Sequence, residues 1–317
     1  MNARSAARLA AVALALAVAV AARPVAAYVR YITESPYLKP FQWMQSCVHV
    51  TGYPNQDDFP DMTPDQVATA ATRAAAAWST ADNTCTFLNI DVMLSSAPAP
   101  KAVADNRSSL IFRHQDWCAP TDSPWVCSYD QAALAITSVF VQRSTGRIQE
   151  ADIEVNDRYF SWTDLDINPD KTKQDLQNAL THEMGHLIGL DHTCYNPSPS
   201  IVRPTDNNGN PVPDCATAPP AVRATTMFAS ATPGDTSKRT LEPDDKQAIC
   251  DIYPLASDPA FCPADGTSNS SAVDNPGCAL AGGAAPGTPW PPAPAAGLAW
   301  ALVLAASRRP SRARRGR

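Results

Sequence analysis

The middle of this 317-residue chain has few basic residues. Nine of its 25 lysines and arginines lie in residues 1–27 and 279–317, which hold no acidic residue. Residues 28–278 therefore carry 16 basic against 31 acidic residues, a net charge of −15. Binding to phosphate requires positive charge, so nucleic acid is not an expected partner. An acidic exported domain is compatible with structural calcium, although charge alone identifies no calcium site.

The sequence also lacks an apolar run long enough for a comfortable membrane span. The longest run, Leu9–Ala22, is shorter than the roughly 20 residues that a transmembrane helix needs. Arg4 and Arg8 precede it, and small residues at 25–27 follow it. This order is typical of a secretory signal peptide over residues 1–27, with an uncleaved membrane anchor as the alternative. The sequence therefore predicts an exported protein, either extracellular or associated with the cell surface.

Nine cysteines allow four disulfides and leave one residue over. Pairing is expected in the oxidising compartments that an exported protein meets. Eight cysteines permit roughly a hundred connectivities, so the pairing cannot be derived from the sequence. Sequential pairing is the working hypothesis: 47–85, 118–127, 194–215 and 250–262. The even count in the body of the chain leaves no thiolate for zinc, and Cys278 stands apart in a Gly/Pro-rich stretch.

The C-terminus changes composition twice. Residues 257–292 are rich in proline, glycine and alanine and are predicted to be a linker. Residues 293–317 hold a short apolar run followed by six arginines. This order resembles a bacterial C-terminal sorting signal of the myxobacterial type, in which Cys278 would be the processing or attachment position. A membrane anchor, which would bring this segment into contact with the bilayer, and a disordered end are the alternatives.

Signals for helices and strands occur between residues 60 and 255. Thr63 and Gln66 predict a capping box for a helix that continues to Trp78. Two more helices are predicted, one from about 171 to 188 and one from Pro243 to just before Pro254. Strands are predicted at 88–94, 109–113, 134–142 and 148–156. In the last strand apolar and polar residues alternate, which indicates one buried face.

Histidine is scarce, with five residues, yet three of them fall within eleven positions. The segment reads His182-Glu183-Met184-Gly185-His186-Leu187-Ile188-Gly189-Leu190-Asp191-His192. Residues four apart on a helix share a face, so His182 and His186 can point at one ion. Gly189 allows a sharp turn that brings His192 back as a third ligand. Three ligands leave a fourth position for water, as in catalytic zinc sites, and Glu183 is the candidate catalytic base.

The other two histidines have no such spacing. His49 and His114 lie far from the motif and are expected to have no role as ligands. For the three motif histidines, the alternative to metal binding is a set of hydrogen-bonded surface residues.

This extended motif resembles the signature of the metzincin zinc peptidases. Residues 224–228, Ala-Thr-Thr-Met-Phe, are similar to the Met-turn beneath the metal of that family, which would place Met227 there. A methionine that only fills the core is the alternative. No tyrosine follows two residues after Met227, unlike the astacin and serralysin branches. Residues 241–253 look like the C-terminal helix of matrixins, and residues 145–156 look like the edge strand of bacterial matrixins.

The resemblance covers about residues 60–255 and implies a fold and a cofactor. It implies an α+β domain of the zincin type over residues 28–256. This domain would have a mixed, mostly parallel twisted sheet, two long helices and a smaller C-terminal subdomain. It implies catalytic Zn²⁺ and a protein or peptide substrate. The chain departs from the matrixin pattern because no cysteine lies in the usual propeptide motif, and Cys47 is expected in a disulfide.

One loop has the composition of a calcium site. Residues 206–210, Asp-Asn-Asn-Gly-Asn, suggest structural Ca²⁺ but lack the spacing of a known calcium loop. A surface loop closed by a disulfide near the substrate cleft is the preferred interpretation.

Together these patterns predict a monomeric, secreted or surface-tethered zinc metalloendopeptidase. Glu183 would take a proton from a zinc-activated water and deliver it to the leaving amine. The substrate is expected to extend along the strand at 148–156. Two alternatives stay open: a non-catalytic surface module stabilised by zinc, and a zinc hydrolase of small amides or esters.

Overall fold

The structure is a computed structural model that describes residues 27–54, 59–114, 117, 129–198, 202–263 and 305–306. The predicted signal peptide up to residue 26, the pair Cys118–Cys127, Cys278 and nearly all of the Arg-tailed segment 293–317 lie outside the described residues. Within the described part of the chain, no helix is long and apolar enough to cross a membrane.

Five strands form one mixed sheet in the order β3-β2-β4-β6-β5. Its neighbouring strands run parallel except β5, which is antiparallel to β6. The strands are β2 (Cys47–Tyr53), β3 (Asn89–Leu94), β4 (Ser108–Arg113), β5 (Ala135–Gln142) and β6 (Arg147–Asn156). The predicted α+β class and the mostly parallel sheet are confirmed, and four strands lie within a residue of their predicted bounds. β2 was not predicted.

The prediction that the strand at 148–156 is an edge strand is wrong. β6 lies between β4 and β5, and β5 is the strand at that edge of the sheet. The expectation of a single buried face on β6 is wrong as well, because Glu150, Asp152 and Glu154 are all buried. Their carboxylates accept hydrogen bonds from backbone N–H groups of β4 and of the segment leading into it, and from the side chains of Arg113 and Tyr129. Polar partners, rather than solvent, therefore cover this second face.

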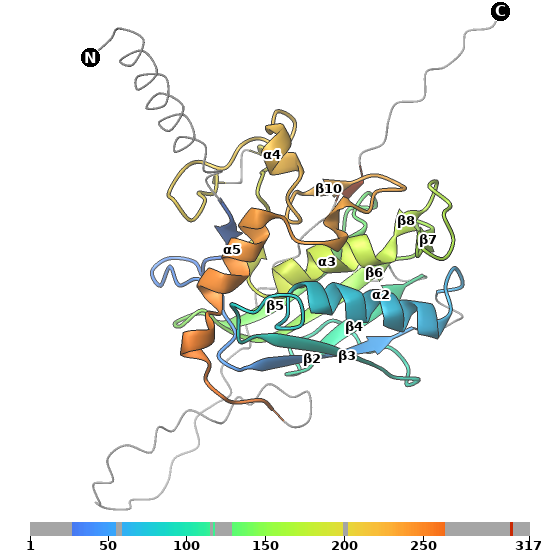
Figure 1. Cartoon of the computed structure of the whole chain (residues 1–317), viewed down its shortest axis with the longest axis horizontal. Helices are drawn as coiled ribbons and strands as arrows, with labels where there is room; N and C mark the ends of the chain where they lie inside the picture. The colour runs from blue at the N-terminus through green and yellow to red at the C-terminus, as the bar shows by residue number, and fades with distance from the viewer. Residues whose placement is uncertain are drawn as a thin grey trace, which may run out of the picture.

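Two helices lie side by side on the other face of the sheet (Figure 1). α2 (Pro64–Ala77) begins at the predicted capping box, in which Thr63 and Gln66 each bond the backbone of the other. Its buried face is mostly alanine, so α3 (Leu176–Leu187) can approach closely. The indole N–H of Trp78, at the end of α2, donates to the carbonyl of Thr181 in α3 at 2.7 Å.

α3 begins five residues later than predicted. Asp175 is its N-cap, and one carboxylate oxygen accepts the backbone N–H of Asn178 at 2.8 Å. Gln174 and Asp175 form the short strand β8, which pairs with β7 (Trp162–Thr163). This pairing holds the chain extended where hydrophobic periodicity alone suggested helix.

The chain after α3 forms a C-terminal part with little regular structure. Its elements are β9 (Leu190–Asp191), α4 (Pro220–Arg223), β10 (Ser230–Ala231), η1 (Ser237–Arg239), α5 (Pro243–Ile252) and η2 (Leu255–Ser257). In Figure 1 the residues from α4 to α5 lie above and to the left of α3, and the segment after α5 runs downward past the sheet, below β2. β9 pairs with the N-terminal strand β1 (Val29–Arg30), and β10 pairs with β11 (Ala305–Ala306). The helix predicted at Pro243 is confirmed as α5.

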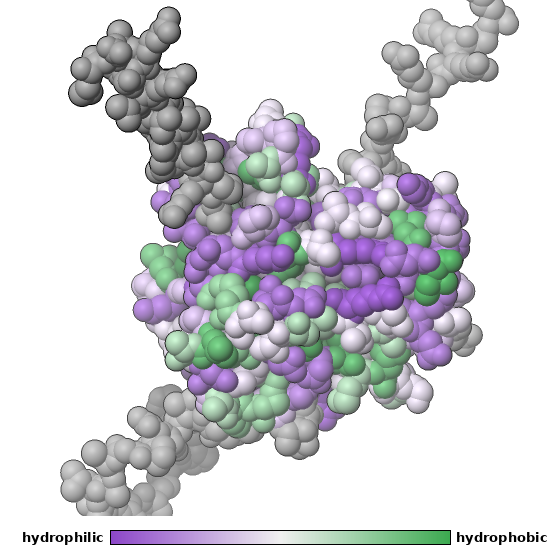
Figure 2. All heavy atoms as spheres, in the orientation of Figure 1, coloured by the Kyte–Doolittle hydropathy of each residue, from purple (hydrophilic) through white to green (hydrophobic). Residues whose placement is uncertain are grey.

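One main hydrophobic core joins the sheet, α2, α3 and α5. Its largest fully buried side chains include Trp43, Trp78, Trp162 and Tyr253. On the outside, hydrophilic residues form bands across the face seen in Figure 2, with smaller hydrophobic areas between them. α3 is buried along its whole length, so His182, Glu183 and His186 lie inside the protein, whereas His192 is partly buried.

Three disulfides link described residues, and two differ from the sequential hypothesis. Cys47 pairs with Cys262 and Cys85 with Cys250, so the expected pairs 47–85 and 250–262 are wrong. The pair Cys194–Cys215 is confirmed. The fold brings β2 beside the segment after η2, and the loop after α2 beside α5. Distance along the chain is therefore a poor guide to which cysteines meet.

Candidate metal centre

Three histidine side chains converge on one point beside α3. The Nε2 atoms of His182, His186 and His192 lie 3.1 Å from one another in every pairing. His182 and His186 are one turn apart on α3, and His192 follows β9. Between them Gly189 has φ +97°, and a Cβ there would lie 2.7 Å from the carbonyl oxygen of Phe41. Both the backbone conformation and this close approach favour glycine at the turn.

In two of these histidines the opposite ring nitrogen faces a backbone carbonyl. Nδ1 of His182 lies 2.6 Å from the carbonyl oxygen of Thr226, and Nδ1 of His186 lies 2.8 Å from that of Leu190. A carbonyl accepts only from a protonated nitrogen, so these contacts place the proton on Nδ1 and leave the Nε2 lone pair facing the centre. Burial lowers the pKa of all three imidazoles, that of His186 to about 4. Neutral imidazole is the form that binds metals.

The donor set fits a tetrahedral metal ion. Three nitrogens about 2.0–2.1 Å from zinc in a tetrahedral arrangement would be about 3.3 Å apart, close to the 3.1 Å seen here. Imidazole nitrogen suits zinc, copper, nickel and iron. These three histidines are thus a candidate site for a metal ion of this kind.

Glu183 directly follows the candidate ligand His182 on α3 and is fully buried. Its Oε2 accepts a hydrogen bond from the hydroxyl of Thr137 at 2.6 Å. Its Oε1 has no hydrogen-bond partner among the described residues. Burial raises the pKa of Glu183 to about 8, and the Thr137 hydrogen bond opposes that shift. A buried carboxylate oxygen without a partner is costly, so Oε1 of Glu183 suits a site that holds a cation or water.

Met227 lies directly beneath the ligand-bearing turn of α3. It is 1% exposed, and a Cβ added to Gly185 would come within 2.2 Å of its sulfur. The preceding residue, Thr226, bonds His182 through its carbonyl, and its N–H donates to Asp245 in α5 at 2.8 Å. The segment around Met227 is therefore held between α3 and α5.

A buried lysine near the site was not predicted. Lys238 in η1 is 2% exposed, and its Nζ donates to the carbonyl of Phe228 and lies 3.4 Å from Nδ1 of His182. Burial lowers the pKa of Lys238 to about 7. No motif marks this residue, because the local sequence Ser237-Lys238-Arg239 reads as exposed and polar.

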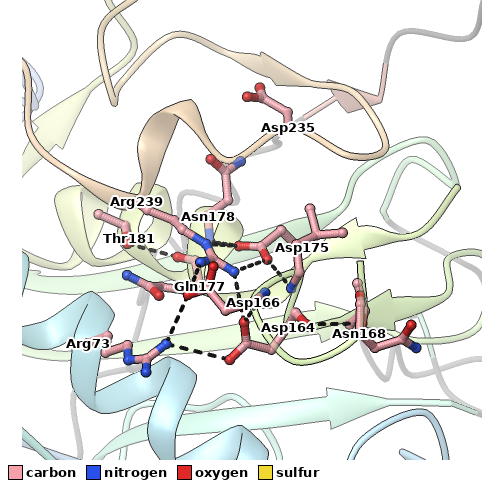
Figure 3. Close-up of polar contacts among 12 residues, drawn as sticks. Arg73, Asp164, Asp166, Asn168, Asp175, Gln177, Asn178, Thr181, Asp235 and Arg239 are labelled. Carbon is pink, nitrogen blue, oxygen red and sulfur yellow. Dashed lines mark hydrogen bonds and ion pairs between the residues drawn. The ribbon is translucent and has the colours of Figure 1, made fainter. Parts of the chain in front are cut away.

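Neighbouring charges hold η1 against the start of α3 (Figure 3). The guanidinium of Arg239 bonds Asp175 at 2.8 Å and Asp164 at 2.9 Å, and it also pairs with Asp166. The backbone N–H of Lys238 donates to the side chain of Asn178 at 2.7 Å. Asp164 and Asp175 are fully buried at the side chain, so one arginine compensates two buried carboxylates.

The N-terminal segment packs behind the third-ligand turn, which sequence patterns did not indicate. β1 pairs with β9 between His186 and His192, and the hydroxyl of Tyr31 lies 3.2 Å from Nδ1 of His186. The indole of Trp43 donates to the carbonyl of Leu187 at 2.9 Å. Residues more than 140 positions earlier therefore support the metal-binding turn.

The other two histidines have carboxylate partners. His114 pairs with Asp157 at 2.8 Å, and His49 pairs with Asp91 at 2.7 Å. His49 also lies close to Cys47 and Cys262, so these three residues form a second candidate group of metal ligands. Sequence spacing did not reveal this proximity. The two sulfurs form a disulfide, which leaves no thiolate to bind a metal.

In the loop at 206–210, the carboxylate of Asp206 stabilises the turn of the loop itself. Asp206 Oδ1 accepts the backbone N–H groups of Asn208 and Asn210 at 2.9 and 2.8 Å. Together with the Cys194–Cys215 bridge, this supports the disulfide-closed surface loop over a calcium loop. Calcium remains a prediction without a site, because neither candidate metal group in the described residues consists of carboxylates alone.

Comparisons with known proteins do not classify the chain. No protein-family model matches it, and a search of curated proteins finds no significant match.

Proposed function

We propose that this protein is a zinc metalloendopeptidase of the metzincin type. The observation that carries the proposal is Oε1 of Glu183, a buried carboxylate oxygen without a partner among the described residues. Glu183 directly follows His182 on α3, and the imidazole nitrogen of His182 converges with those of His186 and His192. A site that used zinc only to stabilise the fold would have no need for such a group next to an open ligand position.

The histidines and Glu183 have different roles in the proposed reaction. His182, His186 and His192 would hold the ion as neutral ligands. When bound, zinc would polarise a water and the scissile carbonyl. Glu183 accepts the proton of the attacking water and returns it to the leaving amine. A nearby dication favours the ionised carboxylate, which offsets the effect of burial on the pKa of Glu183.

Several features support the metzincin assignment over other zinc hydrolases. The sheet has one antiparallel strand at its edge beside the histidine-bearing helix. Gly189 allows the turn to the third histidine, and Met227 packs beneath the ligands. The turn at Gly189 and the place of Met227 are arrangements that the sequence resemblance implies.

A peptide substrate suits the edge strand. β5 pairs only with β6 among the described residues, so its other edge is free to take an added strand. Thr137 of β5 contacts Glu183, so a peptide paired there would run past the base. This replaces the earlier expectation of pairing with residues 148–156. Three disulfides are compatible with an exported protein, and secretion or surface tethering is part of the proposal.

The test compares wild type with Glu183→Ala in zinc analysis and in digestion of a denatured protein. We expect one zinc per chain in both proteins and a loss of about 10²-fold or more in peptide cleavage for the variant. Glu34→Ala is the matched control, because Glu34 is an exposed glutamate 3.5 Å from Arg143 at the surface.

Other outcomes point to the alternative functions. Hydrolysis of small amides or esters without peptide cleavage would indicate the small-substrate hydrolase. Zinc binding without either activity would indicate a structural module. Equal activity of wild type and Glu183→Ala would remove Glu183 as the base.

A further inference from the structure

We propose that Thr137 is a positioning residue for Glu183: its hydroxyl holds one carboxylate oxygen so that the other faces the three histidines. This inference rests on the proposed function of Glu183 as the base. No pattern in the sequence marks Thr137, which lies 46 residues before Glu183 on a different element.

Thr137 is a polar residue in an apolar setting. It occupies the helix-facing side of β5 together with Ala135 and Val139, both of which belong to the main core. All three are fully buried. Valine has the same shape as threonine and would complete this apolar face, so packing alone does not require the hydroxyl.

The hydroxyl of Thr137 has two possible acceptors, both on Glu183, and one of them is closer. Oγ1 lies 2.6 Å from Oε2 of Glu183 and 3.3 Å from the backbone carbonyl oxygen of the same residue. A threonine hydroxyl has one proton to donate, and a short contact to a carboxylate is the stronger of the two. The hydrogen bond therefore joins the edge strand to the side chain of Glu183.

This hydrogen bond restrains rotation of the Glu183 carboxylate. The last torsion of a glutamate side chain is broad and roughly two-fold, so packing restrains it weakly. Fixing Oε2 on Thr137 also fixes the plane of the carboxylate and leaves Oε1 as the oxygen without a partner. A carboxylate that is already held in one orientation loses less conformational entropy when it accepts the proton of the attacking water.

The experiment compares Thr137→Val, which removes the hydroxyl at constant shape, with Thr137→Ser, which keeps it. For cleavage of a fluorogenic peptide, we expect Thr137→Val to lower kcat by about 10–100-fold with little change in KM or zinc content. Thr137→Ser should restore most of the lost kcat. Thr137→Val should cause little further loss when Glu183 is already alanine, because the two residues act as one unit.

Crystal structures of the zinc-loaded wild type and both Thr137 variants supply a readout that does not depend on activity. Oε2 of Glu183 should face residue 137 in wild type and Thr137→Ser and turn away or become disordered in Thr137→Val. An unchanged carboxylate or full kcat in Thr137→Val would overturn the inference. If wild type cleaves no peptide, the proposed function fails, and the carboxylate orientation still decides the role of Thr137.

Discussion

Gly185 and Met227 occupy adjoining space below the metal ligands: a methyl group on Gly185 would lie 2.2 Å from the sulfur of Met227 and 3.0 Å from the ring of Trp78. Gly185 stands between the ligands His182 and His186 on α3. The helix therefore approaches Met227 more closely at this point than a side chain would allow.

Gly185→Ala should destabilise the protein. Alanine is better than glycine by about 1 kcal/mol in a helix interior, but overpacking of a filled core costs about 1–3 kcal/mol. We expect a net loss in the free energy of unfolding, measured by urea denaturation. Adding Met227→Ala to Gly185→Ala should cost less than the sum of the two single changes, since it removes the clash. A Gly185→Ala variant as stable as wild type would contradict this packing.

Arg239→Ala should cost roughly 3–5 kcal/mol of stability, because it leaves the buried carboxylates of Asp164 and Asp175 uncompensated. Arg73 is the matched control. It pairs with Asp164 and Asp166 at 3.7 and 3.3 Å, but its side chain is 48% exposed. Arg73→Ala should therefore cost no more than about 1 kcal/mol. Similar losses for the two variants in chemical denaturation would argue against the central role of Arg239.

The free energy of unfolding should fall as the pH rises from about 4 to about 8, because buried carboxyl groups on β6 lose their protons in this range. Burial raises the pKa of Asp152 to about 8, and that of Glu150 to about 7. An unfolded aspartate has a pKa of about 3.9, so the folded state binds the proton more tightly. The stabilisation from this proton is present below the unfolded pKa and is lost as the pH rises through the folded pKa.

Asp152→Asn isolates this effect, because the amide oxygen can still accept the N–H of Ser109 while the group no longer titrates. Relative to wild type, the variant should gain stability from pH 5 to pH 8 in urea denaturation. A difference that stays constant across this range would show that Asp152 does not titrate there.

Peptide mapping without reduction should recover the linked pairs Cys47–Cys262, Cys85–Cys250 and Cys194–Cys215. Free thiols should be alkylated before digestion, so that exchange does not create new pairs. Recovery of a peptide that joins Cys47 to Cys85 would favour the sequential pairing instead.

The sequence predicted the elements that depend on residues close together in the chain. The Thr63–Gln66 capping box and Pro243 mark the starts of α2 and α5, and both helices begin there. The spacing of His182, His186 and Gly189 predicts that the histidine side chains converge, because this depends only on helix geometry and on the turn that follows the helix. The α+β class was implied by the family resemblance that this motif carries.

What the sequence could not show depends on contacts between distant residues. Thr137, Lys238 and Tyr31 reach Glu183, His182 and His186 across 46, 56 and 155 positions. The edge strand was assigned to residues 148–156 by family resemblance, and this was wrong because strand order depends on the pairing of the whole sheet. Asp152 looked exposed by alternation, yet it is buried because a backbone N–H of β4 bonds it.

Two of the disulfides join residues at or before Cys85 to residues at or after Cys250. Any single break of the backbone between those two positions leaves both fragments covalently attached. For a chain proposed to cut peptide bonds, self-digestion would therefore leave one band of unchanged mass, apart from the added water, on a non-reducing gel. Only a reducing gel would separate the pieces, so preparations of this protein need to be judged intact under reducing conditions.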